Sequence, residues 1–257
     1  MVRVNDIKRK LKNGEPVFGT FVKAPEPSVV EALAFAGFDF IIIDNEHTAM
    51  NMETITNLIR AAELHGMLPT VRVKQKTAAE ILQVLDAGAM GVQVPQVDTR
   101  TEADNVVKWA KYAPVGERGY AASQRSAGYG SMNPVTYAQM SNDNTLVICY
   151  CETKTCVDNL DDILQVEGVD VIFIGPFDLS QSYGVIGQPK HPVVLEVIDR
   201  IISKVTKAGK AVGIIAADAA ETKMWIEKGV RYFSVSSDLG MMMSQGKNLM
   251  NELKKKG

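Results

Sequence analysis

V-D-V-I-F-I-G-P-F-D-L-S, the sequence of residues Val169–Ser180, contains a short apolar run that ends at a glycine and a proline. Residues 171–174 are all apolar, which is typical of a strand buried on both faces of a parallel sheet. Gly175 and Pro176 end this strand, because proline has no N–H for the sheet and glycine permits unusual backbone angles. Asp178 therefore places a carboxylate just beyond the carboxyl end of a predicted buried strand.

A second acid follows an upstream strand in the same way. Leu146–Cys151 is apolar, and Glu152 comes directly after it. If both strands belong to one parallel sheet, these two carboxylates could share a divalent cation. The alternative is that Asp178 caps a turn and Glu152 begins a helix.

Apolar segments that resemble strands recur along the whole chain. Besides the two above, they cover residues 17–22, 40–43, 70–73, 91–94, 211–215 and 232–235. Helical patterns that end near a glycine separate most of them. Eight strand–helix units predict a parallel sheet closed into a single (β/α)8 TIM barrel over residues 1–257, with its active site at the carboxyl ends of the strands.

One segment interrupts this regular spacing. Residues 113–144 are mostly polar and contain Gly116, Gly119, Gly128 and Gly130. The segment is too long for a passive connector in a compact domain. We therefore expect a loop excursion that serves the function or a contact between subunits.

Composition excludes several classes of protein. The 257 residues carry 28 basic and 30 acidic side chains, which are interspersed, so we expect no nucleic-acid partner. No apolar segment approaches the roughly 18–20 residues of a membrane span, and the charged start lacks the apolar core of a signal peptide. The three cysteines form no C-x-x-C pair, which favours reduced thiols in a cytoplasmic protein.

Several polar residues converge on the predicted mouth of the barrel. Asp44 and His47 follow the second strand, Arg72 ends the third, and Glu152 and Asp178 follow the fifth and sixth. Oxygen ligands suit Mg²⁺ or Mn²⁺, which a 2-keto acid could chelate. The metal and Arg72 would stabilise an enolate oxygen, and His47 would transfer protons near neutral pH.

Each of these side chains also has an ordinary interpretation. His47 could be a loop residue, Arg72 could simply pair with Asp44, and Asp86 could lie on a solvated helix end. Lys74 and Lys154 are candidates for a Schiff base, but neither lies within an apolar strand that would lower its pKa.

Several motifs together resemble the HpcH/HpaI aldolase family, which comprises metal-dependent class II aldolases of 2-keto-3-deoxy acids. The motifs are I-I-I-D-N-E-H (Ile41–His47), V-R-V around Arg72, L-D-A-G-A around Asp86, G-E-R-G (Gly116–Gly119), E-T (Glu152–Thr153), N-L-D-D-I (Asn159–Ile163) and G-P-F-D-L-S (Gly175–Ser180). The resemblance runs from about Val17 to Leu239. It implies a barrel of the phosphoenolpyruvate/pyruvate type.

The resemblance also implies roles for individual residues. Glu152 and Asp178 would bind Mg²⁺, Mn²⁺ or Co²⁺, and the backbone at Phe177 and Asp178 would hold the substrate carboxylate.

For catalysis, the resemblance implies that His47 acts as the base. Asp86 would raise the basicity of that histidine, and Arg72 would stabilise the transition state.

Two positions depart from the family pattern. Asn45 replaces the usual glycine and could alter the turn before His47. Tyr150 replaces a glutamine that contacts substrate in many members. Because Tyr150 and Glu152 lie two apart on a strand, Tyr150 should point inward below the metal site and contact a metal-bound water or the keto oxygen. We expect it to shift the substrate range, unless it is only barrel core.

The expected activity is reversible cleavage of a 4-hydroxy-2-keto acid to pyruvate, or an analogue, plus an aldehyde. The alternatives are a CoA-thioester lyase on a related barrel and a catalytically silent barrel that binds a keto acid. The resemblance further implies a homohexamer in which the last helix is exchanged between neighbours, and Met241, Met242 and Met243 would form part of its apolar contact surface.

Overall fold

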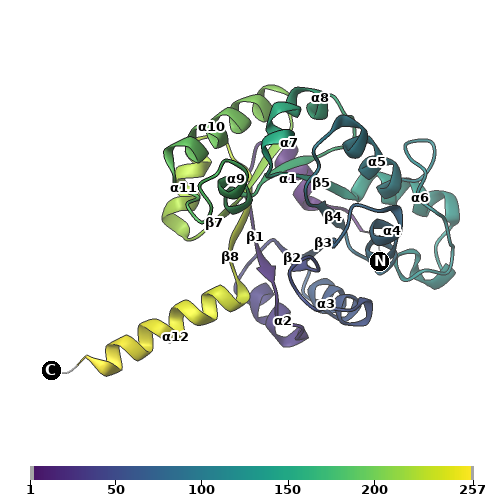
Figure 1. The fold of residues 1–257 in the computed structure, drawn as a ribbon. Coiled ribbons are helices and arrows are strands. Elements are labelled where there is room, and N and C mark those ends of the chain that lie inside the picture. Colours follow the sequence, from purple (N-terminus) through teal and green to yellow (C-terminus); the bar gives the residue numbers. More distant parts are fainter. Residues whose placement is uncertain (1–2, 256–257) are drawn as a thin grey trace.

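Eight parallel strands close into a barrel in chain order, with β1 paired to β8 (Figure 1). The structure is a computed structural model and describes residues 3–255. The strands are β1 (Val17–Val22), β2 (Phe40–Asp44), β3 (Leu68–Arg72), β4 (Gly91–Val94), β5 (Leu146–Cys151), β6 (Val171–Ile174), β7 (Ala211–Ala216) and β8 (Tyr232–Ser237). The predicted TIM barrel is therefore confirmed.

Helices cover the outside of the barrel between successive strands. They are α2 (Pro27–Phe35), α3 (Met52–Leu64), α4 (Ala78–Asp86), α5 (Arg100–Ala110), α7 (Lys154–Asp158), α8 (Leu160–Leu164), α10 (Pro192–Lys207) and α11 (Ala219–Glu227). Their apolar faces and the outward strand residues form one large buried cluster. The helical segment between β5 and β6 is divided in two at Asn159, which serves as the C-cap of α7 and the N-cap of α8.

Aromatic rings fill the interior of the barrel. Phe40 stacks on Tyr232 with ring centroids 4.2 Å apart, and Tyr150 stacks on Phe173 at 4.6 Å. Gly19 leaves the room that Phe40 needs, because a Cβ at this position would lie 2.3 Å from the ring. The packed interior confines any ligand site to the mouth of the barrel, at the carboxyl ends of the strands.

Four short or peripheral elements did not follow from the sequence patterns. They are α1 (Asp6–Lys12), the 3₁₀ helix η1 (Arg125–Gly130), α6 (Pro134–Asn144) and α9 (Pro176–Ser182). Local capping explains two of them. Asn5 and Asn133 accept hydrogen bonds from the first turns of α1 and α6, and Pro134 occupies a favourable first helical position.

Residues 113–144 form an excursion that contains η1 and α6 at the edge of the barrel (Figure 1). A buried cluster of hydroxyl groups anchors it. The Tyr137 hydroxyl lies 3.2 Å from that of Tyr112 and 2.7 Å from Ser126 Oγ, and Gln124 Nε2 donates to both tyrosine hydroxyls. These contacts give the segment a fixed structure despite its polar sequence.

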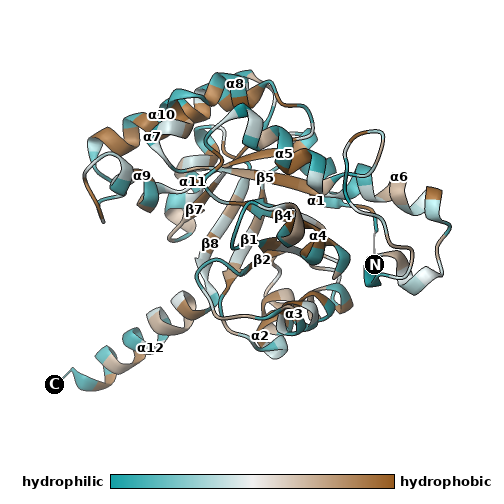
Figure 2. Cartoon of the chain, turned by 45° about the vertical axis from the view of Figure 1, so that its right-hand side comes forward, coloured by the Kyte–Doolittle hydropathy of each residue, from teal (hydrophilic) through white to brown (hydrophobic). Residues whose placement is uncertain are grey.

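The last helix, α12 (Asp238–Lys254), extends away from the barrel (Figures 1 and 2). Of its residues, only Asp238 is buried. Its exposed apolar side chains are Leu239, Met242, Met243, Leu249, Met250 and Leu253. Within the described residues, no helix is long and apolar enough to cross a membrane.

Candidate functional site

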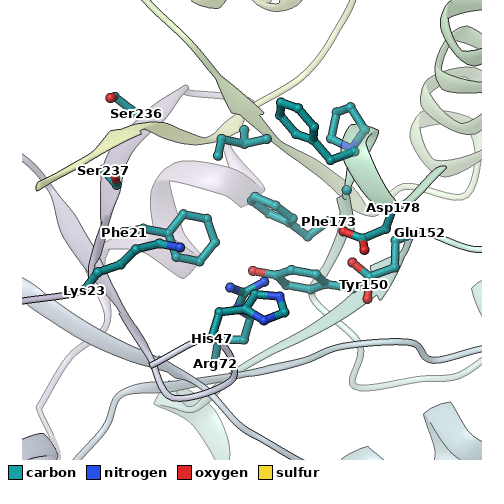
Figure 3. A pocket seen from close by; sticks show the side chains of 14 residues that line it. Phe21, Lys23, His47, Arg72, Tyr150, Glu152, Phe173, Asp178, Ser236 and Ser237 are labelled. Atoms are coloured by element: carbon teal, nitrogen blue, oxygen red, sulfur yellow. The ribbon is translucent and has the colours of Figure 1, made fainter. Parts of the chain in front are cut away.

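A pocket of about 500 Å³ opens at the carboxyl ends of the strands (Figure 3). It brings together nearly all of the residues that the sequence singled out. The predicted members that line it are His47, Arg72, Tyr150, Glu152, Phe177 and Asp178. They come from the ends of β2, β3 and β5 and from the start of α9.

Glu152 and Asp178 form an acid pair over Gly175. A Cβ at Gly175 would lie 2.7 Å from Glu152 Oε2 and 3.6 Å from Asp178 Oδ2, so both carboxylates face the space that the missing side chain leaves. Gly175 has an ordinary φ of −102°, so its role is to leave room. The sequence argument that glycine provides an unusual backbone angle here was wrong.

Burial makes the ionised form of Glu152 costly. Glu152 is 4% exposed, and its Oε1 accepts a hydrogen bond of 2.9 Å from the Gln96 backbone. Burial, and then the negative charge of Asp178, raise the pKa of Glu152 to about 8. A cation between the two carboxylates would remove this repulsion and restore the ionised form.

The donor set of the acid pair fits a hard divalent cation. Among residues 3–255, no cluster of three or more His, Cys, Asp or Glu side chains could hold a metal ion. Glu152 and Asp178 would supply two carboxylate ligands to such an ion, and water or substrate would fill its other positions, as at most Mg²⁺ sites.

Arg72 is held by carboxylates on two sides. Its Nε donates to Asp44 Oδ1 at 3.1 Å, and its Nη1 lies 3.0 Å from Glu46 Oε2. Asp44 is fully buried, and although burial opposes its ionisation, the hydrogen bond and charge of Arg72 hold its pKa below the usual value. The Arg72 guanidinium also lies 4.7 Å from the centre of the Phe21 ring. The pairing with Asp44 thus occurs, and it fixes Arg72 at the pocket.

The turn after β2 presents His47 to the pocket. Asp44 Oδ1 accepts hydrogen bonds from the backbone N–H groups of Glu46 and His47, each at 3.2 Å. The imidazole is 59% exposed, and its Nε2 lies 3.7 Å from Glu46 Oε2. Asn45 does not have a positive φ, so the backbone at this position does not require the glycine that is usual in the family.

Within one chain, Asp86 lies outside the pocket, and the role that the resemblance implies for it stays a prediction. It ends α4, and because that helix runs antiparallel to the strands, its end lies near the amino ends of the strands. There Asp86 Oδ1 accepts a hydrogen bond of 2.5 Å from Arg118 Nη2. Within one chain, Asp86 therefore pairs with Arg118 and does not line the pocket that contains His47.

Tyr150 points inward, as its position two residues before Glu152 implies. Its hydroxyl donates to Gln93 Oε1 at 2.7 Å, and Gln93 Nε2 donates in turn to Thr70 and Tyr232. The hydroxyl hydrogen is thus donated to Gln93, and the expected contact with a metal-bound water or a keto oxygen stays a prediction. The ring of Tyr150 lines the pocket.

Sequence reasoning assigned no role to several other residues at the site. Lys23, Ser236 and Ser237 line the pocket, and Glu46 binds Arg72. Lys23 directly follows an apolar strand, which is the same signal that identified Glu152. Ser236 and Ser237 end the last strand, where hydroxyl residues carried no distinctive pattern.

Comparison with known proteins identifies the family. The sequence model described as HpcH/HpaI aldolase/citrate lyase matches residues 17–244. The chain is 35% identical to a hydroxypyruvate/pyruvate aldolase of Roseobacter denitrificans, with 96% of each protein covered. It is also 35% identical to a 2-dehydro-3,6-dideoxy-6-sulfogluconate aldolase of Pseudomonas putida, with 95% of each covered. A 4-hydroxy-2-oxo-heptane-1,7-dioate aldolase of Shigella sonnei is 36% identical over 93% of this chain and 90% of that protein.

Solved structures agree with the sequence comparison. A HpcH/HpaI aldolase/citrate lyase family protein from Burkholderia cenocepacia superposes with a TM-score of 0.93 at 31% identity, covering 98% of this chain and 100% of the other. The citrate synthase SbnG superposes with a TM-score of 0.87 at 34% identity, covering 96% and 97%. The chain belongs to the HpcH/HpaI aldolase/citrate lyase family.

Proposed function

We propose that the protein is a divalent-metal-dependent aldolase. It reversibly cleaves a 4-hydroxy-2-keto acid, of the 2-keto-3-deoxy sugar acid type, to pyruvate or an analogue plus an aldehyde. The main support for the proposal is that the acid pair, Arg72 and His47 all line one pocket. The named relatives are aldolases, which are carbon–carbon lyases, and this supports the reaction class.

Glu152 and Asp178 would hold Mg²⁺, Mn²⁺ or Co²⁺. When bound, the ion supplies Lewis-acid polarisation of the keto and carboxylate oxygens of the substrate. The backbone amides of Phe177 and Asp178 lie in the first turn of α9, where N–H groups lack partners within the helix, so they are suited to the substrate carboxylate.

His47 would transfer protons, and Arg72 would stabilise the negative charge that develops during the reaction. In cleavage, His47 takes the proton of the C4 hydroxyl, the C3–C4 bond breaks, and its electron pair forms the enolate of pyruvate. The enolate then takes up a proton at its methylene carbon. Arg72, fixed by Asp44 and Glu46, stabilises the negative charge on the enolate oxygen. Since His47 is largely exposed, it can exchange this proton with solvent.

We also propose that the protein forms a homo-oligomer, specifically a hexamer. The exposed apolar side chains of α12 support this proposal, because a monomer would leave them in water. Any effect of Asp86 on His47 would require a second copy of the chain, because the two residues do not meet within one. A cytoplasmic location agrees with the free thiols of Cys149, Cys151 and Cys156.

Pyruvate release from a panel of 4-hydroxy-2-keto acids tests the proposed reaction. It should require Mg²⁺, Mn²⁺ or Co²⁺ and should cease after exhaustive chelation. If cleavage survives chelation and borohydride traps a pyruvate adduct on Lys23, the protein is instead a Schiff-base aldolase.

Exchange of the pyruvate methyl protons tests for a catalytically silent barrel, and the substrate panel tests for a CoA-thioester lyase. A silent barrel would bind pyruvate without exchanging its protons. A CoA-thioester lyase would release no pyruvate from the panel but would cleave an acyl-CoA substrate.

A further inference from the structure

The hydrogen bond that holds Glu152 comes from the loop between β4 and α5. The backbone N–H of Gln96 donates to Glu152 Oε1 at 2.9 Å. The other oxygen, Oε2, faces the gap over Gly175 that Asp178 also borders. The loop thus engages one oxygen of Glu152 and leaves the other for the acid pair, so it sets how this carboxylate is presented to the pocket.

Gln96 donates this hydrogen bond from an unfavourable backbone conformation. Its φ is 52°, in the left-handed region that residues other than glycine rarely adopt. Its side chain is exposed, whereas Pro95 and Val97 on either side are buried. A residue in this region costs free energy and persists only where surrounding contacts hold it there. For Gln96, these are the contacts of its backbone and of the loop around it.

Lys76 makes such a backbone contact. Its Nζ donates to the carbonyl oxygen of Gln96 at 2.5 Å, and it lies 2.6 Å from Glu102 Oε1. Lys76 comes directly before Thr77, the N-cap of α4, and Glu102 lies in the first turn of α5. The ammonium group of Lys76 therefore links the starts of two helices to the one strained residue of the loop between them.

Asp98 fixes the loop just beyond Gln96. Its backbone N–H donates to Glu102 Oε2 at 2.8 Å, and its Oδ1 accepts a hydrogen bond from the Thr153 hydroxyl. Thr153 comes directly after Glu152. The loop is thus attached both to the side chain of Glu152 and to the residue that follows it, so a change in the loop would be passed to this carboxylate.

We propose that Lys76 is a positioning residue of the metal site. By binding the carbonyl oxygen of Gln96, it keeps Gln96 in its strained conformation, and the Gln96 N–H then holds Glu152 Oε1 so that Oε2 is presented to the cation. The proposal rests on the proposed function, because it takes Glu152 as a ligand of the divalent ion. Lys76 does not line the pocket, so its effect on the ion passes through the loop.

Calorimetric titration of the chelated protein with Mn²⁺ tests this role, and thermal denaturation of the metal-free protein is the second readout. Lys76→Met removes the ammonium group, so Gln96 should relax and Mn²⁺ binding should weaken roughly tenfold, as is usual when the partner of a metal ligand is lost. Lys76→Arg can still donate to the carbonyl oxygen and should restore most of the affinity. The melting temperature should change little, because a partly exposed ion pair contributes little to stability.

A second variant and a matched control identify how Lys76 acts. In a Gln96→Gly background, Lys76→Met should weaken Mn²⁺ binding by no more than about twofold, because glycine adopts a positive φ without strain and no longer needs the lysine. Lys74→Met removes a lysine of the same loop whose Nζ contacts the carbonyl oxygen of Met50 instead. This control should bind Mn²⁺ as tightly as the wild type.

The outcomes distinguish this proposal from the proposed function. If the wild type binds Mn²⁺ and Lys76→Met binds it equally well, the positioning role is wrong and the aldolase remains. If Lys74→Met weakens binding as much as Lys76→Met does, the effect is one of charge and the assignment also fails. It fails as well if Lys76→Met lowers the melting temperature strongly and Lys76→Arg does not restore the affinity. If the wild type binds none of Mn²⁺, Mg²⁺ and Co²⁺, the proposed function itself fails.

Discussion

The imidazole of His47 lies in the pocket, 59% exposed, on a turn that Asp44 fixes through backbone hydrogen bonds. His47→Ala should slow exchange of the pyruvate methyl protons roughly 10²- to 10⁴-fold, the usual contribution of a positioned base. Proton NMR in D₂O measures the exchange, and calorimetry measures metal affinity. Metal affinity should barely change, because the acid pair stays intact. An equal loss of metal binding would make His47 a metal ligand.

Tyr150 combines a structural hydroxyl with a ring that shapes the pocket. Tyr150→Phe should destabilise the fold by about 1–3 kcal/mol, because Gln93 Oε1 loses its buried donor, while the substrate ranking is kept. Tyr150→Gln removes the ring and should change the ranking. Chemical denaturation and the 4-hydroxy-2-keto acid panel measure the two effects. If Tyr150→Gln keeps the wild-type ranking and rates within about twofold, the specificity role is wrong.

At the scale of elements, the end of α5 carries a buried lysine that links the barrel to the excursion. Lys111 is 3% exposed, and its Nζ donates to the carbonyl oxygens of Asn142 and Thr145 at 2.6 and 2.7 Å. Burial, and then the positive charge of Lys8, lower its pKa from 10.5 to about 7, although Asp170 and Asp143 oppose the shift. The folded protein therefore loses this proton at a lower pH than the unfolded chain does.

This difference predicts a pH dependence of stability. Above about pH 7 the unfolded chain binds more protons at Lys111 than the folded protein, so the free energy of unfolding should rise with pH. Between about pH 7 and pH 10, the free energy of unfolding of the wild type should rise by about 1 kcal/mol per pH unit relative to that of Lys111→Met. Urea denaturation of both proteins across this range measures the slope. Lys108 lies at an exposed position of the same helix, so Lys108→Met should show the same change of unfolding free energy with pH as the wild type. If Lys111→Met also shows the wild-type change with pH, the prediction is wrong.

At the scale of the whole molecule, α12 extends away from the barrel (Figures 1 and 2), and six of its apolar side chains are exposed. Leu249 and Leu253 are 54% and 70% exposed, and they lie four residues apart, on the same side of the helix. If the helix packs on another copy, Leu249→Glu and Leu253→Glu would bury a carboxylate in an apolar contact, at a cost of several kcal/mol. Light scattering should then show a lower mass than for the wild type.

Lys247→Glu is the matched control for this experiment, since it changes the charge of the same helix at a polar position. This variant should have the same mass in light scattering as the wild-type protein. A wild-type protein that is monomeric at working concentration would refute the assembly.

Local patterns were sufficient to predict the barrel and most of the side chains that meet at its mouth. Runs such as residues 171–174 are apolar because both faces of each strand are buried, so a strand can be recognised without knowledge of its neighbours. The acids Glu152 and Asp178 could be placed together, because every parallel strand ends at the same mouth of the barrel. The same argument predicted that His47 and Arg72 lie at this mouth, because each follows or ends a strand.

The tertiary structure decided the contacts that join distant residues. Gln93 is 57 positions from Tyr150, and no local pattern links them. Asp86 pairs with Arg118 because a helix returns its end to the opposite side of the barrel, away from His47. The end of β1 is fixed to the start of α12, because Asp238 Oδ2 accepts hydrogen bonds from the backbone N–H groups of Lys23 and Ala24. Pairing across the closed barrel sets these contacts, and pairing depends on the whole chain.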